Sequence, residues 1–528
     1  MNASADQRVR NLQAGGERGL LRGSRKGLEK ESLRVTRDGH IARTRHPAGL
    51  GSALCHSEIT TDYSEALLEL VTPAFRDADE AIERLTALHQ YTATQIDDEL
   101  LWATSMPCLV GGDDSIPIAD YGHSNVGWMK HVYRRGLDWR YGRAMQAIAG
   151  IHFNYSFSEA FLRAVQEREG DARPFATFRS DFYFRLIRNF QRHGWLVPYL
   201  MGASPAICKS FTQGRNLDFE SFSPHTFYTP HATSLRMSDI GYKNNAQAAL
   251  NISYNDLDSY VDSLRRAIRT PDPDYARIGT RVDGEWRQLN TNILQIENEY
   301  YSFVRPKAAA RSGEQPTCAL RRAGVEYVEI RALDLDPFSP IGITPDQMVF
   351  LETLLLFCLL SDSPPVDAAE QSHINANQGL VARSGRDPDL TLYRGDGKRV
   401  RLRDWARELF DAMEGPAELL DEIHGDARYR HVLARYRARV DNAELTPSAQ
   451  VLAEMAANRE EFVEFGLRVS AAHAQTLRNT PLDPAIRSRL ARQATESLAE
   501  QARLEAADEP AFEAFLHAYF EQEPTCGS

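Results

Sequence analysis

One stretch of the chain, Gly324 to Gly342 (GVEYVEIRALDLDPFSPIG), carries an aromatic ring, an acid and a base at alternate positions. Because side chains alternate along an extended strand, Tyr327, Glu329 and Arg331 share one face, opposite three apolar residues. The solvent side of a half-buried strand usually carries small polar residues or Lys. A carboxylate beside a guanidinium therefore indicates a binding or catalytic face.

Two upstream segments repeat this pattern. In GLEKESLRV (27–35), the carboxylates of Glu29 and Glu31 fall on one face of an expected strand. In IAGIHFNYSF (148–157), His152 lies on a polar face that is backed by an apolar one. We therefore expect several strands, each apolar behind and acidic or imidazole-bearing in front, to form one sheet with a polar inner face.

A sheet face that gathers carboxylates indicates a divalent metal site. Buried charges need partners, and Mg²⁺ prefers oxygen ligands. The candidate ligands from the residues alone are Glu29, Glu31, Glu69, His152 and Glu329. Non-functional explanations of these residues stay open. An isolated Glu-x-Glu usually lies on a solvated strand edge, and a single His is more often a hydrogen-bonded core residue than a metal ligand.

Two arginines are candidates for binding an anionic substrate. Guanidinium groups bind carboxylate and phosphate in a bidentate way, which suits Arg236 and Arg331. Structural ion pairs with Asp239 or Glu329 would explain them equally well.

A looser basic cluster could contact the phosphates of ATP or be merely solvated; it consists of Arg305, Lys307 and Arg311. The chain has no P-loop, no dinucleotide-binding GxGxxG, and no GxSxG or HExxH motif. Any nucleotide would therefore be held by metal ions and side chains.

The elements that must position these residues are predicted by periodicity and capping. Thr344 to Gln347 has the form of a capping box that begins a buried helix through Leu360. Residues 105–147 look irregular and are expected to form a binding loop. Residues 289–307 are expected to form a strand and then a loop.

We expect three regions along the chain. Residues 1–24 form a polar, loosely ordered lead-in, and residues 25–362 form a catalytic core built on the sheet. Residues 363–528 form a mostly helical region packed on that core. Its first part, 363–398, is expected to be a polar connector, and the helical pattern is continuous from about residue 401.

Composition narrows the functional classes. The 528 residues include 42% hydrophobic and 25% charged residues, which is typical of a soluble globular protein. A formal charge of −12 argues against a nucleic-acid partner. The longest apolar run is shorter than the about 20 residues that span a membrane, so we expect no membrane association. Six scattered cysteines without a CxxC pair favour reduced thiols and a cytoplasmic location.

Seven motifs, taken together, carry a resemblance to a known family. They are GLEKESLRV, TTDYSEALLELVTP, IAGIHFNYSF, GASPAICKSF, TSLRMSDIGY, LQIENEYYSFVRPK and GVEYVEIRALDLDPFSPIG, in this order. As a set they resemble the bacterial type 1 glutamate–cysteine ligases over about residues 20 to 360.

The resemblance implies an α+β fold, in which a curved, mainly antiparallel sheet forms a funnel like that of glutamine synthetase. Mg²⁺ and ATP would lie at the mouth of the funnel. It also implies a reaction in which ATP phosphorylates the γ-carboxylate of L-glutamate, and the amine of L-cysteine then displaces phosphate. The products would be γ-glutamylcysteine, ADP and phosphate, in the first step of glutathione synthesis, with glutathione as a feedback inhibitor.

The same resemblance assigns roles by position. The metal ligands would be Glu29, Glu31, Asp62, Glu69, His152 and Glu329. Arg236 and Arg331 would contact the glutamate carboxylate and phosphate and act with Glu329 in catalysis. The cysteine pocket would consist of Tyr133, Leu137, Gln146, Tyr242 and Tyr301, with Asn154 beside it.

Three other functions remain as alternatives at this point. A ligase of the same fold could join glutamate to a different amine. A metallo-phosphohydrolase could use the same acidic sheet and would release phosphate without any amino acid. A non-catalytic metabolite-binding protein would show no ATP turnover with Mg²⁺.

Overall fold

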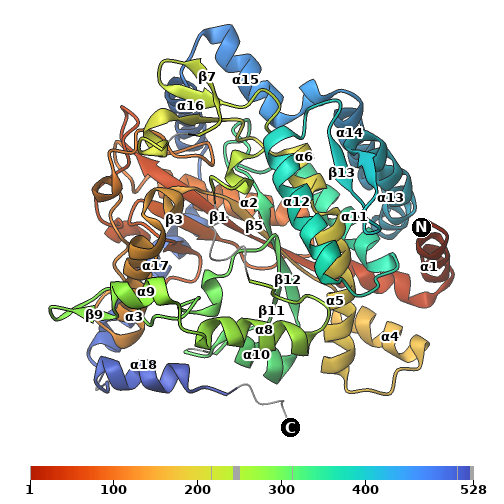
Figure 1. Cartoon of the computed structure of the whole chain (residues 1–528), viewed down its shortest axis with the longest axis horizontal. Coiled ribbons are helices and arrows are strands. Elements are labelled where there is room, and N and C mark those ends of the chain that lie inside the picture. The colour runs from red at the N-terminus through yellow and green to blue at the C-terminus, as the bar shows by residue number, and fades with distance from the viewer. Residues whose placement is uncertain (1, 216, 242–249, 312, 508, 524–528) are drawn as a thin grey trace.

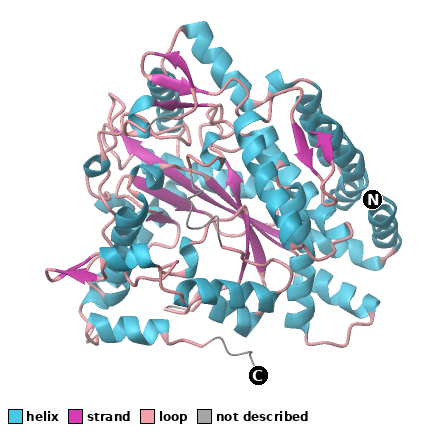
Figure 2. Ribbon diagram, viewed as in Figure 1, coloured by secondary structure: helices cyan, strands magenta, loops and turns pink. Residues whose placement is uncertain are grey.

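The computed structural model describes residues 2–215, 217–241, 250–311, 313–507 and 509–523. Within these residues a seven-stranded sheet crosses the centre of the molecule, and helices surround it (Figures 1 and 2). Six strands follow the order β11-β12-β5-β1-β3-β2, every neighbouring pair is antiparallel, and β4 pairs with the end of β1. The strands are β1 (Arg25–Val35), β2 (Ile59–Thr61), β3 (Leu67–Val71), β4 (Leu100–Leu101), β5 (Ile151–Ser156), β11 (Val304–Lys307) and β12 (Tyr327–Leu333).

The expected α+β fold with an antiparallel sheet is confirmed. Outside the main sheet, the described residues contain three small sheets formed by short strands: β6 (Ala206–Cys208), β7 (Glu220–Ser223) and β8 (Thr226–Tyr228); β9 (Arg281–Val282) and β10 (Glu285–Trp286); β13 (Thr391–Tyr393) and β14 (Arg399–Arg401).

Helices α2 (Ala78–Ala93), α5 (Phe175–His193), α6 (Leu196–Met201) and α11 (Pro345–Leu360) pack on or next to the central strands. Helix α11 is mostly apolar on every side and buried from Gln347 to Leu360, because it lies between sheet-supporting helices on one side and C-terminal helices on the other. It begins with the predicted capping box of Thr344 and Gln347. The buried helix α11 therefore supports the sheet from behind.

The C-terminal region is helical, as expected from about residue 401. Its helices are α13 (Leu402–His424), α14 (Arg428–Asp441), α15 (Pro447–Asn458), α16 (Phe462–Asn479), α17 (Pro484–Glu505) and α18 (Phe512–Phe520). Helices α13 and α14 pack on α11, and α16 and α17 pack on α2. One continuous hydrophobic core joins these helices to the sheet.

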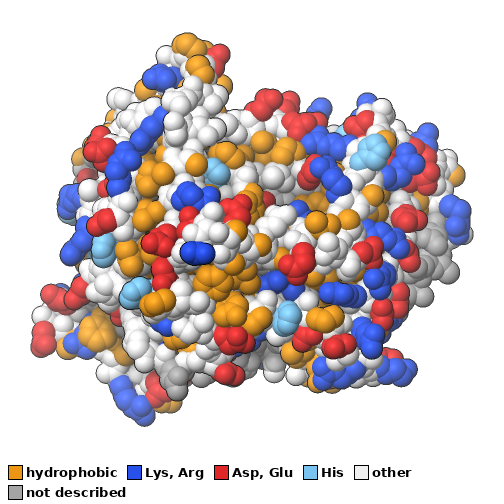
Figure 3. Space-filling view, turned by 90° about the horizontal axis from the view of Figure 1, so that it is seen from above, with side chains coloured by type: hydrophobic (Ala, Val, Ile, Leu, Met, Phe, Trp, Pro, Cys, Tyr) orange, Lys and Arg blue, Asp and Glu red, His pale blue; other side chains and the backbone are white. Residues whose placement is uncertain are grey.

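The remaining helices lie around this assembly: α1 (Asn2–Ala14), α3 (Asn125–Tyr141), α4 (Glu159–Glu169), α8 (Leu257–Arg269), α9 (Pro273–Ile278), α10 (Pro316–Ala323) and α12 (Ala368–Ser384). Acidic and basic side chains are interspersed on the face of the molecule that Figure 3 shows. No helix among the described residues is long and apolar enough to cross a membrane.

The expectation of a loosely ordered lead-in is wrong. Residues 2–14 form α1, which packs on α11 and α13, and a 3₁₀ helix follows at Gly16–Gly23. Val9 and Leu12 are buried in the main core. Two apolar side chains among many polar ones are a weak periodic signal in the sequence. They are enough to hold the helix in place once α11 and α13 provide a surface to pack against.

The expectation of an irregular loop at 105–147 is also wrong, because α3 forms within it. The Ser124 side chain caps α3 by accepting from the backbone N–H of Gly127. One side of the helix packs on α18 and another lines a cavity, so its apolar residues do not form one stripe. Because two faces of the helix make contacts, its sequence lacks the apolar periodicity that would have predicted a helix.

Two further elements differ from expectation. Segment 289–307 is a loop followed by β11, the reverse of the predicted order. The expected connector at 363–398 contains α12 and β13. In both cases tertiary contacts, rather than local pattern, determine the structure.

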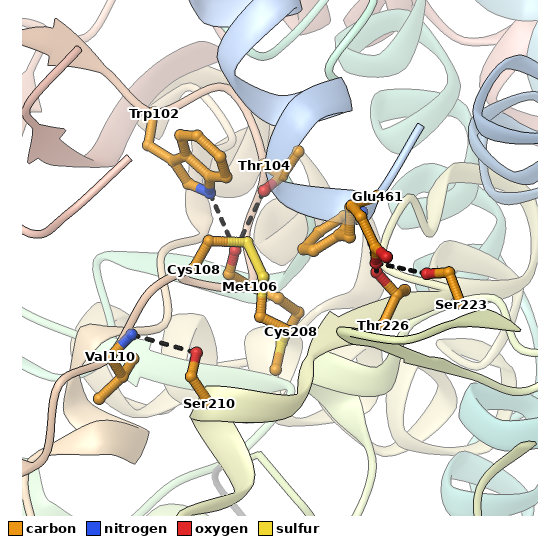
Figure 4. The surroundings of a disulfide bond; sticks show 11 residues. Trp102, Thr104, Met106, Cys108, Val110, Cys208, Ser210, Ser223, Thr226 and Glu461 are labelled. Atoms are coloured by element: carbon orange, nitrogen blue, oxygen red, sulfur yellow. Dashed lines mark hydrogen bonds between the residues drawn. A yellow bond between two sulfur atoms is a disulfide. The ribbon is translucent and has the colours of Figure 1, made fainter. Parts of the chain in front are cut away.

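Cysteine pairing also differs from expectation. Cys108 and Cys208 form a disulfide, whereas all six cysteines were expected to be reduced. The bond joins the loop after β4 to β6, and Val110 N–H donates to Ser210 Oγ beside it (Figure 4). Residues 100 apart in sequence meet here, which no local spacing reveals. The cytoplasmic location stays a prediction.

Candidate active site

Three of the predicted metal ligands meet on one face of the sheet. Glu29 of β1, His152 of β5 and Glu329 of β12 each offer a ligand atom, and these atoms lie within 4.8 Å of one another. His152 Nδ1 is 3.0 Å from Glu29 Oε2 and 3.9 Å from Glu329 Oε1. The strand register explains the meeting, because Glu29 is opposite His152 and Glu329 is opposite Asn154, two positions along β5.

A second acidic group adjoins the first. Glu31 is opposite Glu69 in the β1–β3 pairing. The carboxylate of Glu31 accepts a hydrogen bond from the backbone N–H of Gly150 at 2.6 Å. Glu31 Oε1 is also 3.7 Å from His152 Nε2, so His152 lies between the two groups. Asp62, directly after β2, lines the same cavity as Glu31. The six predicted metal ligands therefore come together on this face.

The second group carries uncompensated negative charge. Burial, followed by repulsion from Glu29, Asp62 and Glu31, raises the pKa of Glu69 well above its ordinary value. Burial also raises the pKa of Glu31, although His152 opposes the shift. Buried carboxylates that lie close together resist ionisation, and a cation bound among them would favour their charged form.

Glu329 has the opposite balance. Burial alone would raise its pKa, but Lys307 and Arg331 outweigh burial and hold the pKa of Glu329 well below the ordinary range. Lys307 Nζ lies 3.2 Å from Glu329 Oε1, and Arg331 Nη1 lies 3.1 Å from Oε2. Glu329 is thus fully ionised at neutral pH, with cations on both oxygens.

The two candidate arginines have different surroundings. Arg331 lies where the β12–β5 pairing is irregular, and bulges of this kind re-aim a side chain. Arg236 is buried, with Nη1 3.8 Å from Asp334 and Nη2 donating to the backbone oxygen of Arg331. Asp239, the alternative partner considered for Arg236, instead pairs with Arg383.

A cavity of about 110 Å³ adjoins the acidic face. Four residues of the predicted cysteine pocket line it: Tyr133, Leu137, Gln146 and Tyr301. The fifth, Tyr242, lies outside the described residues. Asn154 does not line this cavity; its amide donates to Glu29 at 2.8 Å within the acidic face.

The cavity also has lining residues that the sequence reading did not select, notably Tyr63 and Met145. Tyr63 directly follows Asp62 at the end of β2, so its position next to an expected ligand was an available signal. Met145 carried none. Arg134, Tyr141 and Glu299 complete this wall, and Tyr141 donates to Glu299 at 2.6 Å.

The three cationic residues predicted to contact a nucleotide do not stay together. Lys307 bonds Glu329, and Arg305, opposite Glu329 in the β11–β12 pairing, lines the cavity. Arg311 is exposed in the loop after β11, and no contact with the acidic face is seen for it in the described part of the chain. Strand alternation brings the first two to the site and leaves Arg311 beyond the strand end.

The donor set fits a hard divalent cation. The carboxylate oxygens of Glu29 and Glu329 and the imidazole of His152 converge. Asn154 Oδ1 beside them is buried and has no hydrogen-bond partner among the residues that the structure describes. Mg²⁺ takes oxygen ligands and tolerates partial hydration. These residues could hold it without any rearrangement of the sheet.

Comparison with known proteins identifies consistent relatives. A family model for glutamate–cysteine ligase matches residues 9–381. The glutamate–cysteine ligase of Alcanivorax borkumensis is 49% identical over 98% of this chain and 99% of its own. That of Pseudomonas putida strain W619 is 50% identical over 95% of each chain. The crystal structure of a glutamate–cysteine ligase from Francisella tularensis in complex with AMP matches with a TM-score of 0.89 and 38% identity, over 94% of this chain and 97% of that one.

Proposed function

This chain belongs to the glutamate–cysteine ligase family, and we propose that its acidic sheet face and the adjoining cavity are where the family's reaction occurs. The enzyme uses ATP to join the γ-carboxylate of L-glutamate to the amine of L-cysteine, giving γ-glutamylcysteine for glutathione synthesis. The observation that supports this location most strongly is the meeting of Glu29, His152 and Glu329 beside a tyrosine-lined cavity.

We assign the metal to the two acidic groups. Glu29, His152 and Glu329 would hold one Mg²⁺, and the remaining ligands Glu31, Asp62 and Glu69 would face another cation or share it. When bound, Mg²⁺ neutralises the phosphates and the carboxylate, which otherwise repel each other as anions. The pKa of Glu69, which burial and then repulsion from Glu29, Asp62 and Glu31 raise, supports this assignment, because a bound cation would stabilise the ionised carboxylate against both effects.

Cationic side chains position the reacting anions in this proposal. Arg331 lines the cavity, contacts Glu329 and stays protonated at every relevant pH, so it can hold a carboxylate or the transferred phosphate. Lys307 and Arg305 lie on the neighbouring strand and would contact the ATP phosphates. Arg236 would contact the glutamate carboxylate after displacing its weak contact with Asp334.

The reaction then proceeds through γ-glutamyl phosphate. The γ-carboxylate attacks the γ-phosphorus of ATP and releases ADP. The amine of cysteine, seated against Tyr133, Leu137, Gln146 and Tyr301, attacks the acyl carbon and expels phosphate. Two easier steps replace the direct condensation of a carboxylate with an amine.

Glutathione is proposed as a feedback inhibitor. It carries the same γ-glutamyl group as the product, so it can occupy the glutamate position and compete with that substrate. Inhibition that glutamate overcomes would support this. Inhibition that cysteine alone overcomes would contradict it.

The test uses purified protein with Mg²⁺, ATP, glutamate and a panel of amines. We expect ADP and γ-glutamylcysteine in equal amounts, with cysteine as the preferred acceptor. Preference for another amine would refute the acceptor assignment. Phosphate release in the absence of amino acids would indicate a phosphohydrolase, and no ATP turnover would indicate a binding protein.

A further inference from the structure

Helix α18, near the C-terminal end of the described chain, packs on α3, and another side of α3 lines the cavity (Figure 1). The two helices share a small hydrophobic cluster, which includes Val132 of α3 and Leu516 of α18 and is separate from the main core among the described residues. Tyr133 of α3 packs against this cluster and also lines the cavity. The cluster therefore supports one wall of the cavity.

A second wall of the cavity contacts the same cluster. The 3₁₀ turn Glu297–Glu299 contributes Asn298 and Glu299 to the lining. Ile296, directly before this turn, packs against the cluster that holds α18 and α3 together. Two walls that are far apart in the sequence thus share one support.

Hydrogen bonds through α10 connect α18 to the same turn. The backbone oxygen of Tyr519 in α18 accepts from Gln315 Nε2 at 2.6 Å, and Gln315 is the residue that precedes α10. Thr317, in the first turn of α10, donates to the Glu297 carboxylate through both its backbone N–H and its hydroxyl. Helix α18 is therefore joined to the second wall by polar as well as apolar contacts.

The segment before α18 also contacts the beginning of α3. The carboxylate of Glu509 accepts from the backbone N–H of Asn125, the first residue of α3, at 2.6 Å. The Asn125 amide in turn donates to the backbone oxygen of Pro510 at 2.8 Å. A carboxylate at a helix N-terminus is favourable, because it pairs with an N–H group that has no partner within the helix and with the positive end of the helix dipole. The C-terminal segment thus holds α3 at its first turn and along one side.

We propose that α18 braces the two walls of the cavity and that Leu516 is a positioning residue for the acceptor amino acid. This inference rests on the proposed function, which seats cysteine in this cavity. Leu516 is 5% exposed and does not line the cavity, so it acts through the α3 residues Val132 and Tyr133. The residues proposed to hold ATP and glutamate do not belong to this cluster. A shift of α3 should therefore weaken the binding of cysteine more than that of the other two substrates.

The experiment is steady-state kinetics of wild type and Leu516→Ala, in which each of the three substrates is varied in turn. The KM for cysteine should rise about 5- to 20-fold, while the KM values for ATP and glutamate stay within about twofold of wild type. The kcat per folded molecule should change less than the KM for cysteine. Leu516→Met, which conserves the side-chain volume, should keep the KM of wild type.

Leu433→Ala in α14 is the matched control. Leu433 is also a C-terminal-region leucine with 5% exposure, but it packs in the main core and does not line the cavity. This control should lower the Tm and leave the KM for cysteine unchanged. Glu509→Ala is a second variant, at an exposed position where folding is not at risk. It should raise the KM for cysteine about two- to fivefold.

Three kinetic results would overturn the inference: an unchanged KM for cysteine in Leu516→Ala, an equal rise in all three KM values, or the same rise in Leu433→Ala. If Leu516→Ala does not fold, Glu509→Ala decides, and an unchanged KM for cysteine in that variant overturns the inference. If wild type does not join cysteine to glutamate, the proposed function itself fails, so the two failures are distinguishable.

Discussion

Strand β1 buries charged side chains on both of its faces. On the back face, Lys26 Nζ lies 2.6 Å from Glu352 of α11, and Arg34 Nη1 lies 2.5 Å from Glu99. Tyr155 and Tyr429 also donate to the Glu352 carboxylate. Each of these cations has an anion within the fold.

The front face has no such balance. Glu29 and Glu31 point to the side that also carries Glu69, and burial together with repulsion from these carboxylates raises the pKa of Glu69 well above its ordinary value. Nearby cations contact Glu329 rather than Glu69. Charge pairing of Lys26 and Arg34 on the back supports the fold, while Lys30 on the same face donates to Ser32 Oγ. The carboxylates gathered on the front are the ones that we propose to bind a ligand.

The largest expected effect comes from Glu329→Gln. This substitution keeps the shape but removes the charge that meets both the metal and two cations, so we expect kcat to fall by about 10³-fold or more. The Tm should fall as well, because Lys307 and Arg331 lose their carboxylate partner, so kcat is compared per folded molecule. Steady-state kinetics with thermal unfolding checks both. Turnover within about tenfold of wild type would contradict the assignment.

On the back face, Glu352→Gln should damage stability instead. It leaves Lys26 buried beside a neutral group, and breaking one partner of a buried pair costs about 3–5 kcal/mol. Urea unfolding measures this loss, and kcat per folded molecule should stay near that of wild type. Combining it with Lys26→Met should recover most of the stability. A double variant as unstable as the single one would show that the charge pair is not the cause.

A smaller effect is expected for Glu69→Gln. Loss of one surplus carboxylate should raise the Mg²⁺ concentration for half-maximal activity by about 10- to 100-fold, with kcat largely restored at high Mg²⁺. Glu65→Gln is a matched control, because its buried carboxylate accepts from the backbone N–H groups of His46 and Asp120. Equal Mg²⁺ requirements in the two variants would argue against a metal at Glu69.

The smallest effect is a pH dependence of the back-face pair. Burial would raise the pKa of Glu352, but Lys26 and Tyr429 outweigh burial and lower it. A carboxylate with a lowered folded-state pKa stabilises the fold above its unfolded pKa and loses that contribution as pH falls through the folded value. The difference in unfolding free energy between wild type and Glu352→Gln should therefore narrow below about pH 4.5. The total narrowing should be about 1.4 kcal/mol for each unit by which the folded-state pKa of Glu352 lies below its unfolded-state pKa. A gap that is constant from pH 7 to pH 3.5 would refute this.

Period-two alternation predicted the front face well. It assigned Glu29, Glu31, His152 and Glu329 to polar strand faces, and the structure brings them together. It did not predict the back of β1, which was expected to be apolar. The partner of Lys26 is 326 residues away in the chain, so no local pattern contains it.

Other features also depend on distant contacts. Register between strands decides which carboxylates become neighbours, and the sequence specifies faces but not register. Helix α3 was not predicted because two of its faces make contacts, so its apolar residues do not form one stripe. The Cys108–Cys208 disulfide was not predicted because the two cysteines are far apart in the sequence. The motif set supplied the residues proposed for the cysteine pocket, which no periodicity would have identified.

We propose that the surplus carboxylates on the front of the sheet hold a divalent metal. Crystals grown with Mn²⁺, ADP and a glutamate analogue would test it by anomalous diffraction at the manganese edge. We expect an Mn²⁺ peak bonded to Glu29, His152 and Glu329. Anomalous peaks elsewhere, with this face free of metal, would contradict it.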